Sequence, residues 1–142
     1  MNEHFFSDPA RAGVYYLAAT RRGMADKPAW PPGFHHWRLE IARGQTTAAV
    51  LEQIGKTLRL PEWYGANFDA LHDCLSDPQC LPGKGHVLSI AGSDNLRAGD
   101  PDGFATLLEV FQAAADALRE ANIPLWILLD AKAPGIRPLP VA

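Results

Sequence analysis

The chain has 142 residues, of which 47% are hydrophobic and 20% are charged, a composition typical of one globular domain that buries its own core. A formal net charge of −3 argues against a protein that binds nucleic acid directly through a basic surface. The chain has two cysteines, no signal-like start and no apolar run of about 20 residues, which argues against a secreted disulfide scaffold and against a membrane span. We therefore expect a cytoplasmic protein with reduced thiols.

The amino-terminal part of the chain predicts two strands. Residues 14–20 (VYYLAAT) are rich in strand-forming residue types but too few for a core of their own. A cluster of glycine and proline at residues 27–33 indicates a loop. Residues 36–42 (HWRLEIA) alternate apolar and polar side chains, the pattern of a strand. We expect residues 36–42 to belong to the main sheet and residues 14–20 to add an edge strand.

Two helices are predicted next. A helix over residues 47–58 is indicated by a threonine pair that can cap it and by one apolar stripe, and the proline at position 61 bars its continuation. A shorter helix is predicted over residues 68–76, because Asn67 is a good N-cap and apolar residues follow it at helical spacing. Gly65 permits a tight turn before this second helix.

The remaining half of the chain predicts a strand, a long helix and a strand. Residues 87–91 (VLSIA) form a short apolar run typical of a buried strand. Asp100 and Pro101 begin a helix whose apolar residues share one face and which ends near Asn122. Residues 125–129 (LWILL) have the composition of a strand buried on both faces of its sheet. The alternation predicts an open α/β fold with parallel pairing and right-handed crossovers.

Negative charge is concentrated in residues 61–81. This segment contains four acidic residues, Glu62, Asp69, Asp73 and Asp77, and no lysine or arginine, so the rest of the chain carries almost no net charge. The aspartates are spaced four apart on the predicted helix, where like charges cost an isolated helix about 0.2–0.5 kcal/mol per pair. They point away from the apolar face, toward solvent or a partner.

Two explanations of this segment stay open. Exposed aspartates can simply solvate a helix, Asp69 suits the positive end of the helix dipole, and the aromatic rings of Trp63 and Tyr64 can pack as a half-buried wall. Large aromatic rings in a loop also commonly form a contact surface. Because aromatic and acidic residues cluster here, the segment favours a partner-binding surface.

Residues 60–77, LPEWYGANFDALHDCLSD, closely resemble the signature segment of the barstar family of intracellular ribonuclease inhibitors. They follow the family pattern L-P-E-x-Y-G-x-N-x-D-A-L-x-D-C-L, and the resemblance extends over residues 37–130. It implies a barstar-like α/β fold, in which a small parallel three-stranded sheet packs with helices in two or three layers. We accordingly divide the chain into an N-terminal extension (1–35), a barstar-like domain (36–131) and a Pro-rich C-terminal tail (132–142).

The resemblance also implies binding rather than catalysis, with no cofactor and no metal. In the family, the matching helix and loop plug a nuclease active site. Asp73 matches the aspartate that occupies the phosphate-binding site, Asp69 matches its acidic companion, and Trp63 and His72 replace other aromatic contact residues. The implied partner is a barnase-like or other basic ribonuclease, bound by a chain that is monomeric when free. The predicted partner-binding residues are Trp63, Tyr64, Asn67, Asp69, His72, Asp73 and Asp77.

Other functions fit the same residues. An immunity or protein-interaction module for another basic effector would use the same surface. A small hydrolase built on His72 with Asp69 or Asp73 has the residue types but lacks an oxyanion device and a nucleophile elbow. Adjacent His35 and His36 point to opposite faces of a strand and complete no recurrent ligand spacing, so they do not predict a metal site.

Overall fold

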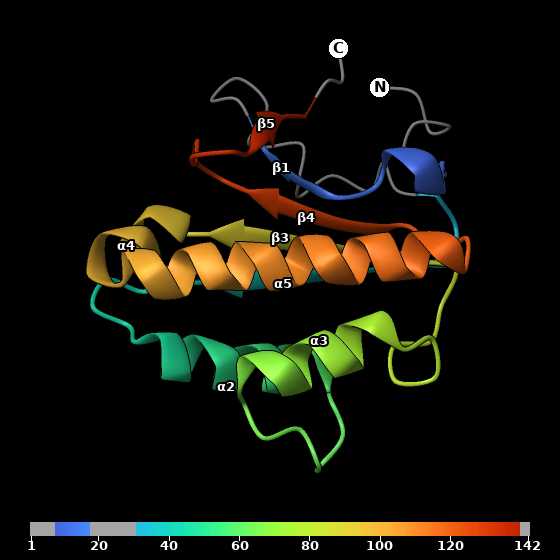
Figure 1. Ribbon diagram of the computed structural model, residues 1–142, viewed down its shortest axis with the longest axis horizontal. Coiled ribbons are helices and arrows are strands. Elements are labelled where there is room, and N and C mark those ends of the chain that lie inside the picture. Colours follow the sequence, from blue (N-terminus) through green and yellow to red (C-terminus); the bar gives the residue numbers. More distant parts are fainter. Residues whose placement is uncertain (1–7, 18–30, 140–142) are drawn as a thin grey trace.

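A computed structural model describes residues 8–17 and 31–139 of the chain (Figure 1). Its centre is a five-stranded sheet with the strand order β2-β3-β4-β1-β5, and every strand pair in it is parallel. The strands are β1 (Val14–Tyr16), β2 (Phe34–Glu40), β3 (Gly85–Ala91), β4 (Leu125–Leu129) and β5 (Arg137–Pro138). The predicted parallel α/β class is confirmed.

The sheet has five strands: the predicted three, the strand β1 predicted within residues 14–20, and β5, which was not predicted. The prediction that β1 is an edge strand is wrong. Strand β1 lies between β4 and β5, pairing Val14 with Ile127 on one side and Tyr15 with Arg137 on the other. The ring of Tyr15 stacks on Trp126 of β4 with centroids 5.7 Å apart. Strand β3 pairs with one edge of β4, and β1 and β5 cover the other edge. Without them, the unpaired edge of an entirely apolar strand would be exposed. Residues 18–20 of the predicted first strand lie outside the described residues.

The described α-helices are α2 (Thr47–Leu58), α3 (Phe68–Ser76), α4 (Ser93–Gly99) and α5 (Pro101–Glu120), and a short 3₁₀ helix, η1, spans Pro9–Arg11. The predicted caps are confirmed. Thr46 Oγ1 accepts a hydrogen bond from the N–H of Ala49, and the carboxylate of Asp100 accepts one from the N–H of Gly103. Among the described residues, no helix is long and apolar enough to span a membrane.

Helix α4 was not predicted. Only one of its apolar residues, Leu96, is fully buried, so its sequence carries little helical pattern. Its start is fixed by Asp130, which follows β4 and accepts hydrogen bonds from the N–H of Gly92 at 2.8 Å and from the hydroxyl of Ser93 at 2.7 Å. A side chain distant in sequence therefore supplies the signal that begins this helix.

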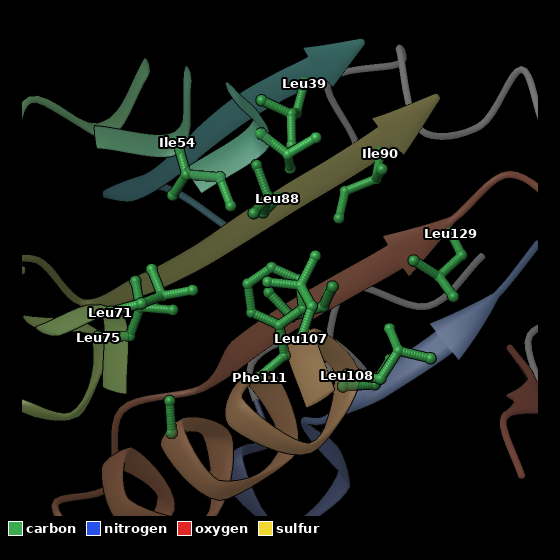
Figure 2. Close-up of a cluster of buried hydrophobic side chains, with 14 of the residues drawn as sticks. Leu39, Ile54, Leu71, Leu75, Leu88, Ile90, Leu107, Leu108, Phe111 and Leu129 are labelled. Carbon is green, nitrogen blue, oxygen red and sulfur yellow. The ribbon is translucent and has the colours of Figure 1, made fainter. Parts of the chain in front are cut away.

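The helices pack on one face of the sheet. Their buried side chains meet those of the strands in a single cluster (Figure 2), which includes Leu39, Ile54, Leu71, Leu75, Leu88, Ile90, Leu107, Phe111 and Leu129. Side chains on the other face form a second, smaller buried cluster around Tyr15, Val87, Trp126 and Leu128. The described helices and strands thus form two layers, and α2 and α3 lie beside α5 in the helical layer (Figure 1).

Candidate partner-binding site

Helix α3 is fixed in place from both its end and its inner face. Asn67 caps it, with Oδ1 accepting a hydrogen bond from the N–H of Ala70 at 2.8 Å. Leu71 and Leu75 are fully buried in the core cluster (Figure 2), and the helix packs against α5. The opposite face of α3 is therefore presented on a rigid support.

The exposed face of α3 carries negative charge. Asp69 and Asp77 are exposed, and the side chain of Asp73 is 72% exposed. Within the part of the chain that the structure describes, no lysine or arginine forms an ion pair with these three aspartates. The Nδ1 atom of His72 lies 3.9 Å from Oδ1 of Asp73, too far for a hydrogen bond. The predicted uncompensated charge is thus present on the surface, not neutralised by folding.

The three aspartates do not have equal surroundings. Asp69 lies in the first turn of α3, where the helix dipole stabilises a carboxylate. Asp77 ends the helix, and its Oδ1 accepts a hydrogen bond from the N–H of Gln79 at 2.9 Å. Asp73 lies in the middle of the helix, so it neither interacts with the positive end of the helix dipole nor accepts a hydrogen bond at the end of the helix. Its carboxylate is the one whose exposure nothing in the local structure explains.

The two aromatic residues of the preceding loop point in different directions. Trp63 is 61% exposed and is the most exposed large hydrophobic side chain described. Tyr64 is half-buried, and its hydroxyl donates a hydrogen bond to the carbonyl of Leu51 in α2 at 2.8 Å. Burial raises the pKa of Tyr64 to about 12. Tyr64 therefore positions the loop, while Trp63 is available for contact.

The turn in this loop is made by residues that sequence reasoning did not single out. Ala66 adopts a left-handed conformation with φ of 52°, so the strained position of the turn is Ala66 and not Gly65. Gly55 of α2 is required for a different reason. A Cβ atom at Gly55 would lie 2.6 Å from Cε2 of Tyr64, so a larger residue there would displace the loop.

A groove of about 430 Å³ lies between the end of α2 and the loop that follows it. Its lining includes Lys56, Arg59 and Glu62, and it was missed in the sequence because charges of both signs at the end of a helix are an ordinary solvated pattern. The loop before α3 therefore separates an acidic helix face from a groove whose lining carries charges of both signs.

Comparison with known protein families fits this arrangement. A family model described as Barstar (barnase inhibitor) matches residues 34–130, which is more than half of the chain. The chain belongs to the barstar family. No curated protein matches it. The barstar match begins at β2 and ends after β4, so it contains the whole of α3 and its loop, while β1 and β5 lie outside it.

Within this barstar-family domain, the predicted site residues fall into two groups. Trp63, Asp69, His72 and Asp73 reach the surface and make no local hydrogen bond through their side chains, whereas Tyr64, Asn67 and Asp77 make one, although Asn67 and Asp77 are also exposed. Among the described residues, no group of three or more His, Cys, Asp and Glu side chains could hold a metal ion. The exposed group offers carboxylate acceptors and one indole, which suits recognition of a cationic surface.

Proposed function

We propose that this barstar-family chain inhibits a ribonuclease by placing the exposed face of α3, together with Trp63, in a basic active site. The family match supports an inhibitory role. The observation that carries the proposal is the carboxylate of Asp73, which is 72% exposed on a rigid helix and has no lysine or arginine partner among the described residues.

Replacement of phosphate by carboxylate supplies the mechanism. A ribonuclease cleft holds the RNA phosphate with arginine, lysine and histidine, and a carboxylate can accept the same charge-assisted hydrogen bonds. Because Asn67 and the buried residues of α3 fix the helix before binding, little conformational entropy is lost when Asp73 is engaged. Trp63 adds apolar contact area beside the ion pair that Asp73 would form with the ribonuclease. Asp69 strengthens the long-range electrostatic attraction that accelerates association.

The proposal extends to the setting in which the inhibitor acts. We expect a cytoplasmic protein that is monomeric when free and that does not bind nucleic acid directly. Residues 36–131 are proposed as the inhibitory domain. The extension (1–35) and the tail (132–142) contribute β1 and β5 to its sheet, which supports a stabilising role for both.

A second candidate keeps the surface and changes the partner. The groove between α2 and the loop is lined by Lys56 and Arg59 as well as by Glu52 and Glu62, whereas a cleft that is basic throughout attracts only negative charge. This observation favours an immunity or interaction module for another effector, one that carries a basic patch next to a surface of mixed charge. The hydrolase alternative gains no support from the geometry, because His72 and Asp73 lie on an open helix surface without a hydrogen bond between them.

Titration of ribonuclease activity tests the proposal. Secreted ribonucleases with basic active sites are titrated with the wild-type chain, with Asp73→Ala, and with Asp94→Ala, which removes one exposed carboxylate from α4. We expect the wild type and Asp94→Ala to inhibit equally and Asp73→Ala to inhibit much more weakly. Equal inhibition by all three would reject α3 as the binding surface. If no ribonuclease is inhibited and a pull-down from the native host captures a different basic protein, the second candidate replaces the first.

A further inference from the structure

An open pocket of about 620 Å³ lies where the start of β2 meets the end of α2 and the turn that follows α3; we refer to it as the β2 pocket. Its lining includes Phe34, His35 and Trp37 of β2, Thr57 and Arg59 at the end of α2, and Leu81 of the turn. No aspartate or glutamate is among the described residues that line it. Pockets of roughly 300–1,000 Å³ hold small organic ligands, so the size of the β2 pocket suits one.

Aromatic rings line the pocket on the side of β2. The ring of Trp37 stacks on that of His86, with centroids 5.4 Å apart and planes 21° apart. His86 is fully buried, and its Nε2 lies 3.0 Å from the carbonyl of Leu81, so the ring that supports Trp37 is fixed. His35 is exposed, and its ring centroid lies 5.3 Å from that of Trp37 with the planes inclined by 57°. The two rings form a corner against which a planar ligand ring can stack.

Arg59 supplies the charge of the pocket. It is exposed, and its side chain makes no ion pair or hydrogen bond with any described residue. Its backbone is fixed in the left-handed conformation, with φ of 55°, and its N–H donates to the carbonyls of Gly55 and Lys56. The carboxyl end of a helix carries a partial charge of only about −0.5. The full positive charge of Arg59 outweighs it, so the pocket attracts anions.

We propose that the β2 pocket binds a planar aromatic ring that carries an anionic group, the chemistry shared by nucleoside monophosphates and indole carboxylates. The ring stacks on Trp37 beside His35, and the guanidinium of Arg59 pairs with the phosphate or carboxylate. An N–H group on the ring has an acceptor nearby. The carbonyl of Thr57 lies in the last turn of α2, and the residue four positions later, Pro61, has no N–H to donate to it.

This site is separate from the surface proposed to bind a ribonuclease. None of the described residues that line the β2 pocket belongs to α3, and Trp63 is not among them. Ligand binding in the pocket is therefore expected whether or not Asp73 engages a ribonuclease. Arg59 also lines the groove between α2 and the loop, so a ligand is assigned to the β2 pocket only if Trp37 responds to it.

Calorimetric titration of the full chain tests the proposal. The probes are adenosine 5′-monophosphate and indole-3-acetate, together with adenosine, which lacks the anionic group, and inorganic phosphate, which lacks the ring. We expect at least one of the two complete probes to bind about tenfold or more tightly than adenosine and phosphate, because it makes both the stacking contact and the ion pair. Tighter binding of one complete probe than of the other identifies the phosphate or the carboxylate as the preferred group. Absence of binding by both, or binding of inorganic phosphate as tightly as either, would overturn the proposal.

Variants test the two contacts separately. Arg59→Gln should raise the dissociation constant about tenfold. The matched control Arg43→Gln, which removes an exposed arginine outside the pocket, should change it by no more than about twofold. His35→Ala removes an exposed stacking ring and should weaken binding about threefold. Circular dichroism checks that the variants are folded, and equal binding by the wild type and folded Arg59→Gln would contradict the assigned ion pair.

Spectra of the wild type locate the ligand without any substitution. In assigned ¹H–¹⁵N spectra, the indole N–H signal of Trp37 should shift as the ligand is added, whereas that of Trp63, which is outside the pocket lining, should stay in place. This result would support the β2 pocket even if a variant failed to fold. A ligand that shifts the signal of Trp63 and leaves that of Trp37 unchanged binds elsewhere, and the proposal would be overturned.

Discussion

The hydroxyl of Tyr64 donates a hydrogen bond to the carbonyl of Leu51 across 2.8 Å, and this contact fastens the loop before α3 to α2. The tyrosine ring also lies against Gly55, one turn further along α2. The preceding residue in the chain, Trp63, is 61% exposed. Tyr64 therefore positions the loop, and the adjacent Trp63 leaves its indole accessible to a partner.

Tyr64→Phe should destabilise the fold without removing the ring. The variant loses the hydrogen bond to Leu51, so we expect the free energy of unfolding in urea to fall by about 1 kcal/mol. Trp63→Phe, which changes an exposed side chain, should stay within about 0.5 kcal/mol of the wild type. If Trp63→Phe proved the more destabilising of the two, the roles assigned to these residues would be reversed.

Gly55→Ala should destabilise the protein although alanine favours helices. The added Cβ would lie 2.6 Å from Cε2 of the anchored Tyr64 ring, and such overpacking costs on the order of 1–3 kcal/mol. Gly99→Ala in α4 is the matched control, because no atom lies within 4 Å of its added Cβ; it should be stabilising by up to about 1 kcal/mol. Thermal or urea unfolding of both variants measures the difference. A Gly55→Ala protein as stable as Gly99→Ala would show that the loop is not packed on α2.

Stability should fall as the pH drops from about 6.5 to about 4. His86 is fully buried and contacts the rings of both His35 and Trp37, and its Nε2 lies 3.0 Å from the carbonyl of Leu81. Burial, and to a lesser extent His35, lower the pKa of His86 from 6.5 to about 4. In this window the unfolded chain binds the proton and the folded chain does not, so protonation favours unfolding by up to about 3 kcal/mol.

The comparison that isolates His86 uses His86→Phe. Carboxylates titrate in both proteins, so the difference between their stability profiles reports on the histidine. Above about pH 6.5 and below about pH 4 that difference should be constant, because the imidazole has the same charge in folded and unfolded chains. Unfolding in urea at a series of pH values gives the profiles. If the stabilities of the wild type and His86→Phe differed by a constant amount between about pH 6.5 and about pH 4, the lowered pKa of His86 would be contradicted.

Asp130→Ala should loosen the start of α4. The carboxylate accepts hydrogen bonds from the N–H groups of Gly92 and Ser93 and from the Ser93 hydroxyl. Although burial alone would raise it, these bonds hold the pKa of Asp130 below its usual value. Removing the acceptor leaves partly buried donors unpaired, and we expect a loss of about 1–3 kcal/mol. Amide hydrogen exchange should be faster across α4, whereas Asp94→Ala, an exposed change in the same helix, should leave most of that protection intact.

Sequence patterns predicted most of the helices because the signals that begin and end them are local. Asn67 and Asp100 cap the helices that follow them, as their residue types indicate. The start of α4 could not be predicted in the same way, since its cap comes from Asp130 and lies after a later strand. The position of β1 depends equally on distant contacts, including the stacking of Tyr15 on Trp126, and a short strand carries no pattern that specifies its neighbours.

The candidate site was predictable by position but not by orientation. The acidic spacing placed Asp69 and Asp73 on the outer face of α3, where the structure has them. Nothing in two successive aromatic residues of one loop indicates which is buried, and only the contact of Tyr64 with α2 separates it from Trp63. The groove that Lys56 and Arg59 line together with Glu52 and Glu62 escaped prediction because it forms only when the loop folds back beside α2.

The affinity of Asp73→Asn for a ribonuclease that the wild type inhibits tests the central proposal most directly. Asparagine keeps the shape of the side chain and removes its charge, so calorimetry measures the loss of the carboxylate alone. We predict a dissociation constant raised roughly thirtyfold or more, since an unpaired partner charge costs about 2 kcal/mol or more. The control Asp94→Asn should change it by no more than about twofold. An Asp73→Asn chain that binds as tightly as the wild type would contradict the proposal that α3 occupies the basic site.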